Sequence, residues 1–192
     1  MSDRPDRPAP KRKEPRRVTA DYLERSALHY LERFASSSAN LRRVLMRKVE
    51  LSARAHGTDR EEGARWVDAL VARYLSSGLL NDRLYAEAKA TGLQRRGGST
   101  RAIRQKLAAK GLDETDIEGA LSGLEGAEEG RADLEAALAY ARRRRLGPYR
   151  LPEDREARRD KDLAALARAG FDLGTARRVV DAEDPDALDG DA

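Results

Sequence analysis

The chain contains no cysteine, and it has only two histidines among its 192 residues. The absence of cysteine excludes disulfide bonds, thiolate catalysis and cysteine-ligated metal sites. His29 and His56 have no neighbour at the spacing of metal ligands, and the sequence contains neither a Walker-type phosphate loop nor a dinucleotide fingerprint. We therefore expect no metal, no cofactor and no enzymatic activity.

Long apolar segments and aromatic residues are also scarce. No apolar stretch approaches the roughly 18 residues of a membrane span, and no signal-type apolar region stands at the N-terminus, so we expect a soluble, cytoplasmic protein. Aromatic residues make up 5% of the chain, and runs of β-branched residues are almost absent. This composition is typical of an all-α fold. Because many of the apolar residues are alanine, we expect small modules with thin cores that depend on their neighbours.

The net charge of +4 understates how basic most of the chain is. Six acidic residues and no basic residue lie from Asp181 onward. Without these six, 28 acidic residues face 38 basic residues, which leaves residues 1–180 with a net charge of +10. Such an excess favours a polyanionic partner, above all nucleic acid, although a solvated and charge-rich helical surface would show the same composition.

A short motif occurs twice at the boundary between helical patterns. Residues 110–113 read Lys-Gly-Leu-Asp, and residues 169–172 read Ala-Gly-Phe-Asp. A glycine in the left-handed position, an apolar residue and an aspartate N-cap together predict a tight corner between two helices. Two such corners indicate a repeated supersecondary unit, and helical repeats present surfaces that usually bind rather than catalyse.

Further capping signals divide the chain into nine predicted helices in three groups of three. We expect Ser38, Asp172 and either Asn81 or Asp82 as N-caps, a capping box at residues 58–61, and Pro152 at the first position of a helix. The predicted organisation is a disordered basic arm at 1–17, three-helix modules at 18–78, 79–126 and 127–181, and a disordered acidic tail at 182–192. The second module has helices over 82–95, 100–110 and 114–124, and the third begins with a helix over 128–145.

Helical spacing of apolar residues predicts the core. The first helices of the three groups place at the core Leu23, Ala27, Tyr30, Leu31 and Phe34; Leu84, Tyr85 and Ala88; and Leu134, Ala137, Leu138 and Ala141. The middle helices superpose with Leu41 and Leu45 matching Ile103 and Leu107, and with Leu166 matching Leu107. The last helix carries Leu173, Ala176, Val179 and Val180.

Basic residues concentrate on or beside the middle helices and at the end of the helix over 128–145. If the modules stack, these residues predict a stripe that binds phosphates without reading bases. Residue by residue, the alternative of solvated cations paired with nearby acids stays open. The candidate partner-binding and DNA-binding residues are Arg42, Arg43, Arg47, Lys48, Arg95, Arg96, Arg101, Arg104, Lys106, Lys110, Arg142, Arg143, Arg144, Arg145, Arg158 and Arg159.

The central segment carries a family pattern. Residues 78–82 read Gly-Leu-Leu-Asn-Asp and are followed, in order, by Tyr85, Ala86, Arg96, Gly98, Ile103, Leu107, Lys110, Gly111 and residues 117–121. A related pattern precedes it at Ala27, Leu28, Tyr30, Leu31, Ser38 and residues 41–43 and 45–48. With these residues the chain resembles the RecX family of regulators of the RecA recombinase over about residues 20–180. Val49 departs from the family pattern, which has glycine there.

The resemblance implies three tandem three-helix modules in an elongated, curved array. It also implies a monomeric, non-catalytic protein that binds along the groove of the RecA–DNA filament. Such a protein would mainly inhibit filament assembly, ATPase activity and strand exchange in recombination, DNA repair and the SOS response. Its binding to DNA itself would be weak and without sequence preference.

Two other functions fit an all-α, basic chain. A helix–turn–helix transcription regulator would need arginine, asparagine or glutamine near the start of its reading helix, whereas residues 113–116 read Asp-Glu-Thr-Asp. A structural α-solenoid scaffold would show no effect that depends on DNA.

Overall fold

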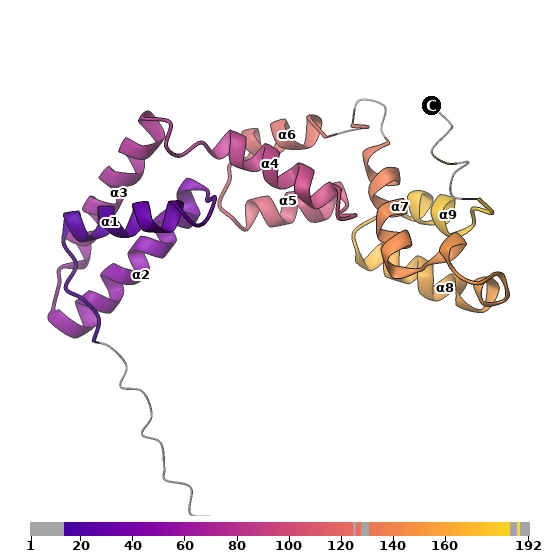
Figure 1. Cartoon of the computed structure of the whole chain (residues 1–192), viewed down its shortest axis with the longest axis horizontal. Helices are drawn as coiled ribbons and strands as arrows, with labels where there is room; N and C mark the ends of the chain where they lie inside the picture. Colours follow the sequence, from indigo (N-terminus) through magenta and orange to yellow (C-terminus); the bar gives the residue numbers. More distant parts are fainter. Residues whose placement is uncertain (1–13, 125, 128–130, 185–187, 189–192) are drawn as a thin grey trace, which may run out of the picture. The chain divides into compact units, whose positions relative to one another are not determined.

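The computed structural model describes residues 14–124, 126–127, 131–184 and 188. Within these ranges the chain forms nine α-helices and one short 3₁₀-helix, η1, with no β-strand (Figure 1), which confirms the all-α prediction. Two compact units divide the chain. Unit 1 comprises the described residues up to Phe34 together with Leu41–Ser77, and unit 2 comprises Ala35–Asn40 together with the described residues from Gly78 onward. The predicted disorder of residues 1–13 and of most of the tail lies outside the described residues.

Unit 1 is built from α1 (Ala20–Leu31), most of α2 (Ser38–His56) and α3 (Arg60–Ser76). Its buried residues include Leu23, Leu45 and Val67, all at expected core positions. Phe34 was expected in the same core, but it follows the end of α1 and is 51% exposed. The predicted capping box is also wrong, because the N-cap of α3 is Asp59, whose carboxylate accepts the Glu61 N–H at 2.8 Å.

Unit 2 contains a first core cluster formed by α4 (Asp82–Gln94), α5 (Thr100–Ala108) and α6 (Glu114–Ser122). Asn81 caps α4 by accepting the Leu84 N–H at 2.9 Å. The expected core face of α4 is only partly correct: Tyr85 is half-buried and packs against the cluster, whereas Leu84 is 60% exposed and Ala88 is exposed. The helix buries Ala86, Ala90 and Leu93. Small alanines allow α4 to pack closely against its neighbours, so close approach rather than side-chain size selects the buried face.

A second core cluster in unit 2 is formed by α7 (Ala132–Arg144), η1 (Gly147–Tyr149), α8 (Pro152–Arg168) and α9 (Leu173–Val180). Pro152 occupies the first turn of α8 as predicted. α7 starts later than the predicted helix over 128–145, whose first residues, 128–130, lie outside the described residues. In α9, Leu173 is exposed, against expectation, while Ala176, Val179 and Val180 are buried.

Both glycine corners have the predicted geometry. Gly111 and Gly170 adopt φ values of +77° and +96°, and the buried residue that follows each one donates its N–H to a carbonyl of the preceding helix. These are the bonds of a Schellman motif. Asp113 and Asp172 then cap α6 and α9 by accepting backbone N–H groups at 2.8 and 3.0 Å.

A repeated carboxylate clamp holds unit 2 together. Asp133, in the first turn of α7, accepts the Thr100 N–H at 2.7 Å and the Thr100 hydroxyl at 3.0 Å. Asp82, in the first turn of α4, accepts the Ser38 N–H at 2.7 Å and the Ser38 hydroxyl at 2.5 Å. In each case the carboxylate satisfies an otherwise free N–H at the start of a helix, where a negative charge is favoured.

The serine that directly precedes each clamped residue forms a further hydrogen bond to a neighbouring helix corner. Ser37 and Ser99 donate their hydroxyls to the carbonyls of Lys110 and Ala169, which directly precede the corner glycines. Ser37 also caps α2 by accepting the Asn40 N–H at 3.2 Å, so the N-cap lies one residue before the expected Ser38, whose hydroxyl is used by Asp82. A Cβ at Gly170 would lie 2.6 Å from the Ser99 Oγ, so the close packing of Ser99 against this corner requires glycine there, in addition to the positive φ.

Replacing Asp133 by alanine is expected to lower the free energy of unfolding by about 1–3 kcal/mol, because two hydrogen bonds to a carboxylate at the α5 N-terminus are lost. Chemical denaturation measures the change. Asp160, whose side chain is 97% exposed, provides the control, and Asp160→Ala should change the free energy by less than about 0.5 kcal/mol. Equal losses for the two variants would contradict a structural role of the clamp.

Candidate nucleic-acid interface

The candidate cations lie on α2, at the end of α4, on α5, at the end of α7 and on α8. Most are exposed, and Lys48, Arg104, Lys110 and Arg159 are half-buried. Exposure alone does not make a cation available to a phosphate, because a neighbouring carboxylate can already hold it. The contacts of each side chain therefore separate the candidates.

Three candidate arginines are held by carboxylates. Arg42 pairs with Asp68 at 2.7 Å and Arg159 pairs with Asp181 at 2.7 Å, whereas Arg104 contacts both Glu114 and Glu118. Each carboxylate raises the pKa of its arginine, chiefly through the hydrogen bond that it accepts. At these three positions the structure therefore has the paired surface charges that the sequence left open as the alternative to phosphate binding.

Several candidate cations stack on tyrosine rings. The Lys48 ammonium lies 5.4 Å from the Tyr22 ring centroid. The guanidinium of Arg142 lies 5.6 Å from the Tyr149 centroid, and those of Arg143 and Arg144 lie 5.8 and 5.4 Å from the Tyr140 centroid. Such contacts orient the guanidinium planes without neutralising their charge. Arg145 differs, because it closes α7 in the left-handed conformation with a φ of 55°.

The remaining candidates include exposed cations that form no ion pair with any described residue. Arg101 and Lys106 lie on α5, Arg95 and Arg96 follow α4, and Arg158 lies on α8. Arg47 on α2 and the half-buried Lys110 at the corner after α5 are likewise outside any ion pair to the described residues, whereas Arg43, which is also exposed on α2, has an interaction partner. Unneutralised cations therefore persist on both units.

A cationic groove of about 600 Å³ collects part of this charge in unit 2. Lys106 from α5, Arg144 and Tyr140 from α7, and Arg168 from α8 line it, and none of the acidic residues that the structure describes does. Lys106 and Arg144 were among the sequence candidates, whereas Arg168 and Tyr140 were not. No sequence signal singles out Arg168, because only the packing of α8 beside α5 and α7 places its side chain at the groove.

The start of α6 carries the opposite charge. Asp113, Glu114 and Asp116 stand at its first turn. Burial raises the pKa of Asp116, and the negative charges of Asp113 and Asp82 add to this effect. A helix that begins with clustered carboxylates repels phosphates, so α6 is a poor reading helix for duplex DNA.

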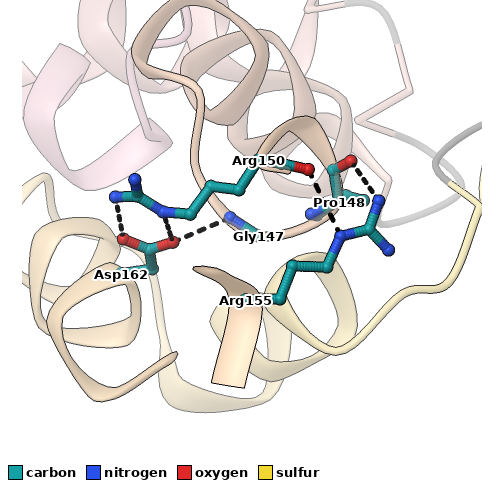
Figure 2. A network of polar contacts seen from close by, with 5 residues as sticks. All are labelled: Gly147, Pro148, Arg150, Arg155 and Asp162. Atoms are coloured by element: carbon teal, nitrogen blue, oxygen red, sulfur yellow. Dashed lines mark hydrogen bonds and ion pairs between the residues drawn. The ribbon is translucent and has the colours of Figure 1, made fainter. Parts of the chain in front are cut away.

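A buried ion pair fixes the turn that follows the arginine run of α7. Asp162 is only 1% exposed. Its carboxylate accepts the Gly147 N–H at 2.8 Å and two Arg150 N–H groups at 2.6 and 2.7 Å (Figure 2). Arg155 donates to the Pro148 carbonyl at 2.7 Å on the other side of the same turn. This network holds η1 between α7 and α8 and thereby positions the exposed end of α7.

Sequence reasoning missed Asp162, although a signal was available. Leu166 matches Leu107 of the middle module, so Asp162, four residues earlier, takes the place of Ile103. An aspartate at a position that is apolar in the other modules indicates a buried and paired charge.

Two further observations concern sites that the described residues lack. They contain no cluster of three or more histidine, cysteine, aspartate or glutamate side chains placed to hold a metal ion. None of the described helices combines the length and the apolarity that crossing a membrane requires.

Comparisons with known proteins identify relatives along most of the chain. The family model described as "RecX, second three-helix domain" matches residues 81–121, which include nearly all of α4–α6. "Regulatory protein RecX" of Myxococcus xanthus (strain DK1622) is 47% identical over 170 residues, which cover 88% of this chain and 89% of that protein. "Regulatory protein RecX" of Agrobacterium fabrum (strain C58 / ATCC 33970) is 33% identical over 171 residues, covering 87% and 86%. No solved structure matches the chain.

Proposed function

This chain belongs to the RecX family of regulatory proteins, and on that premise we propose that it binds the RecA–DNA filament and restrains the recombinase. The restraint acts on filament assembly, ATPase activity and strand exchange. The protein catalyses no reaction itself, in keeping with the regulatory name of its relatives.

A nucleoprotein partner is favoured mainly by the exposed cations that form no ion pair with a described residue. Arg101 and Lys106 on α5 are exposed and form no ion pair with a described residue, and Arg144 on α7 lies exposed within the same unit. Cations without carboxylate partners attract a polyanion at long range and contact its phosphates without sequence preference.

The modular fold supports regulation by a small amount of protein. Two core clusters within unit 2 each present exposed cations, so one molecule can make several weak contacts with the same filament. Linked contacts multiply through their effective concentration, and tight filament binding then needs no single strong site. We therefore expect much tighter binding to RecA filaments than to RecA monomers or to bare DNA.

The test measures the ATPase activity of RecA filaments on single-stranded DNA against added protein. The ATPase rate is expected to fall at less than one molecule per RecA protomer, because one bound molecule affects several neighbouring subunits. Arg101→Glu combined with Lys106→Glu should weaken this inhibition about tenfold or more, since both cations are unpaired among the described residues. Arg104 is left unchanged, because Glu114 and Glu118 already hold its guanidinium.

The matched control reverses two exposed arginines that already pair with local carboxylates, Arg25 with Asp21 and Arg83 with Glu87. Arg25→Glu combined with Arg83→Glu has the same change in net charge and should inhibit nearly as well as the parent. Thermal unfolding of all three proteins is followed in parallel. If the parent protein leaves filaments unaffected, the proposed function is wrong; if both double variants inhibit equally, α5 is not the contact surface.

A further inference from the structure

We propose that the cationic groove between α5, α7 and α8 is a binding site for single-stranded DNA. The proposal rests on the function proposed above and assigns one part of it to a defined place in the fold. The groove takes the phosphates of the strand on Lys106 and Arg168, and it takes a base against the Tyr140–Arg144 stack.

The charges of the groove lack an internal counterion. Lys106, Arg144 and Arg168 approach it from three different helices, and no aspartate or glutamate among the described residues lines it. None of the three forms an ion pair with a described residue, in contrast to Arg104, which lies on the same helix as Lys106 and is held by Glu114 and Glu118. Like charges that converge on a concave surface repel one another, and a bound anion converts this repulsion into attraction.

The groove wall allows close approach of a ligand backbone. Gly98 and Ala102 line the groove on the α5 side, and Ala165 and Ala169 line it on the α8 side. On α5 the cation Lys106 lies four residues after Ala102, so both occupy one face of the helix. Small side chains beside long cationic ones let a phosphate reach the ammonium and guanidinium groups without a steric barrier.

Size and aromatic content favour a polynucleotide over a free anion. The groove volume of about 600 Å³ falls in the range of sites that hold a nucleotide-sized ligand, roughly 300–1,000 Å³. The guanidinium of Arg144 lies over the Tyr140 ring at 5.4 Å from its centroid, and aromatic rings and guanidinium groups are platforms on which unpaired bases stack. Bases of duplex DNA are stacked on one another and unavailable, so the groove should select a single strand.

The experiment measures binding of a fluorescent oligothymidylate of about 20 nucleotides to the full chain by fluorescence anisotropy over a salt series. The groove variant is Lys106→Gln combined with Arg168→Gln. Its matched control is Lys161→Gln combined with Arg178→Gln, two exposed cations outside the groove with the same loss of charge. The groove variant should bind at least tenfold more weakly than the parent, and the control less than about threefold more weakly.

The salt series adds a second readout. Loss of two phosphate contacts should reduce the slope of log affinity against log salt by about 1.4, at roughly 0.7 per contact for a single strand. Equal affinities and slopes for the groove variant and the control would overturn the proposal.

The base contact is tested separately from the charge. Tyr140→Leu should weaken oligothymidylate binding about fivefold or more, while Tyr140→Phe, which keeps the ring, should leave the affinity unchanged within about twofold. Circular dichroism checks that both variants stay folded, because Tyr140 also meets the Phe171 ring at 6.0 Å. Should Tyr140→Leu match the parent while folded, the base does not use this stack and the proposal is wrong.

Competition with unlabelled duplex of the same sequence and with inorganic phosphate identifies the occupant. Single-stranded DNA should displace the probe at least tenfold more effectively than either of them. Equal competition by the duplex would overturn the assignment to a single strand, and complete displacement by millimolar phosphate would reassign the groove to a simple anion.

The outcomes also separate this inference from the proposed function. If the parent restrains RecA filaments but the groove variant binds oligothymidylate like the control, the function stands and the groove assignment fails. If the parent has no effect on filaments but the groove variant loses its affinity for oligothymidylate, the groove assignment stands and the proposed regulatory function is wrong.

Discussion

Asp162→Ala is expected to lower the free energy of unfolding by about 3–5 kcal/mol. The carboxylate is nearly inaccessible, and it accepts hydrogen bonds from the Gly147 amide and the Arg150 guanidinium at 2.6–2.8 Å. Its removal leaves the Arg150 side chain, which is only 26% exposed, without the charge that balances it. Chemical denaturation of the full chain measures the loss.

Two further variants of this site make the result specific. Asp162→Asn keeps one oxygen for the Gly147 amide, but it loses the charge and replaces the other acceptor oxygen by an amide nitrogen that faces an Arg150 N–H donor. Much of the cost of the alanine variant should therefore remain. Asp160→Ala, two residues away with a side chain that is 97% exposed, should cost less than about 0.5 kcal/mol. A cost for Asp162→Ala as small as that of Asp160→Ala would show that the ion pair is dispensable.

The same carboxylate makes stability depend on acid pH. Burial pushes the pKa of Asp162 upward, but the hydrogen bonds from Arg150 and Gly147 and the nearby positive charges prevail, so the pKa in the folded protein is lowered. The stabilisation is therefore complete above the unfolded pKa of about 3.9 and is lost as the pH falls through the lower folded-state value. The difference in unfolding free energy between parent and Asp162→Asn should stay constant near neutral pH and shrink below about pH 4.

Leu107→Ala is expected to cost about 2–5 kcal/mol, through lost burial and the cavity that remains. Leu107 is fully buried among Ile103, Ile117 and Leu121, at the centre of the α4–α6 cluster. Urea denaturation of the parent and the variant compares the two free energies.

Leu84→Ala is the informative control, because sequence periodicity places Leu84 in the core whereas the structure leaves it 60% exposed. Its replacement should change the free energy of unfolding by less than about 0.5 kcal/mol. A large cost for Leu84→Ala would mean that α4 buries the face predicted from the sequence, and it would contradict the observed packing of Ala86 and Ala90.

The corners were predictable because their causes are local. Gly111 and Gly170 occupy left-handed positions, and Asp113 and Asp172 accept N–H groups only a few residues away. All the partners of such a motif lie within one short stretch of chain, so the order of the residue types is enough to identify it. The same holds for Pro152 at the start of α8.

The predictions were wrong where a residue far away in the sequence contacts the group or the helix face in question. Ser38 has the composition of an N-cap, but its hydroxyl donates to Asp82, 44 residues away, and Ser37 caps the helix instead. On α4, helical periodicity is present on two faces, and packing within unit 2 selects the alanine face over the one that carries Leu84. Periodicity measures the spacing of apolar residues along one helix and holds no information on what faces them.

The sequence by itself determined the all-α fold, the family, the glycine corners and the presence of many cations, because composition and short-range order express these properties directly. Tertiary structure alone decided which of the candidate cations are neutralised. Arg42 meets a carboxylate 26 residues away, and Arg104 meets one 14 residues away. It also brought Arg168 to the groove of Lys106 and Arg144 and buried Asp162 beside Arg150. Charge interactions act through the distance between side chains in space, and for these pairs that distance is set only when the helices pack.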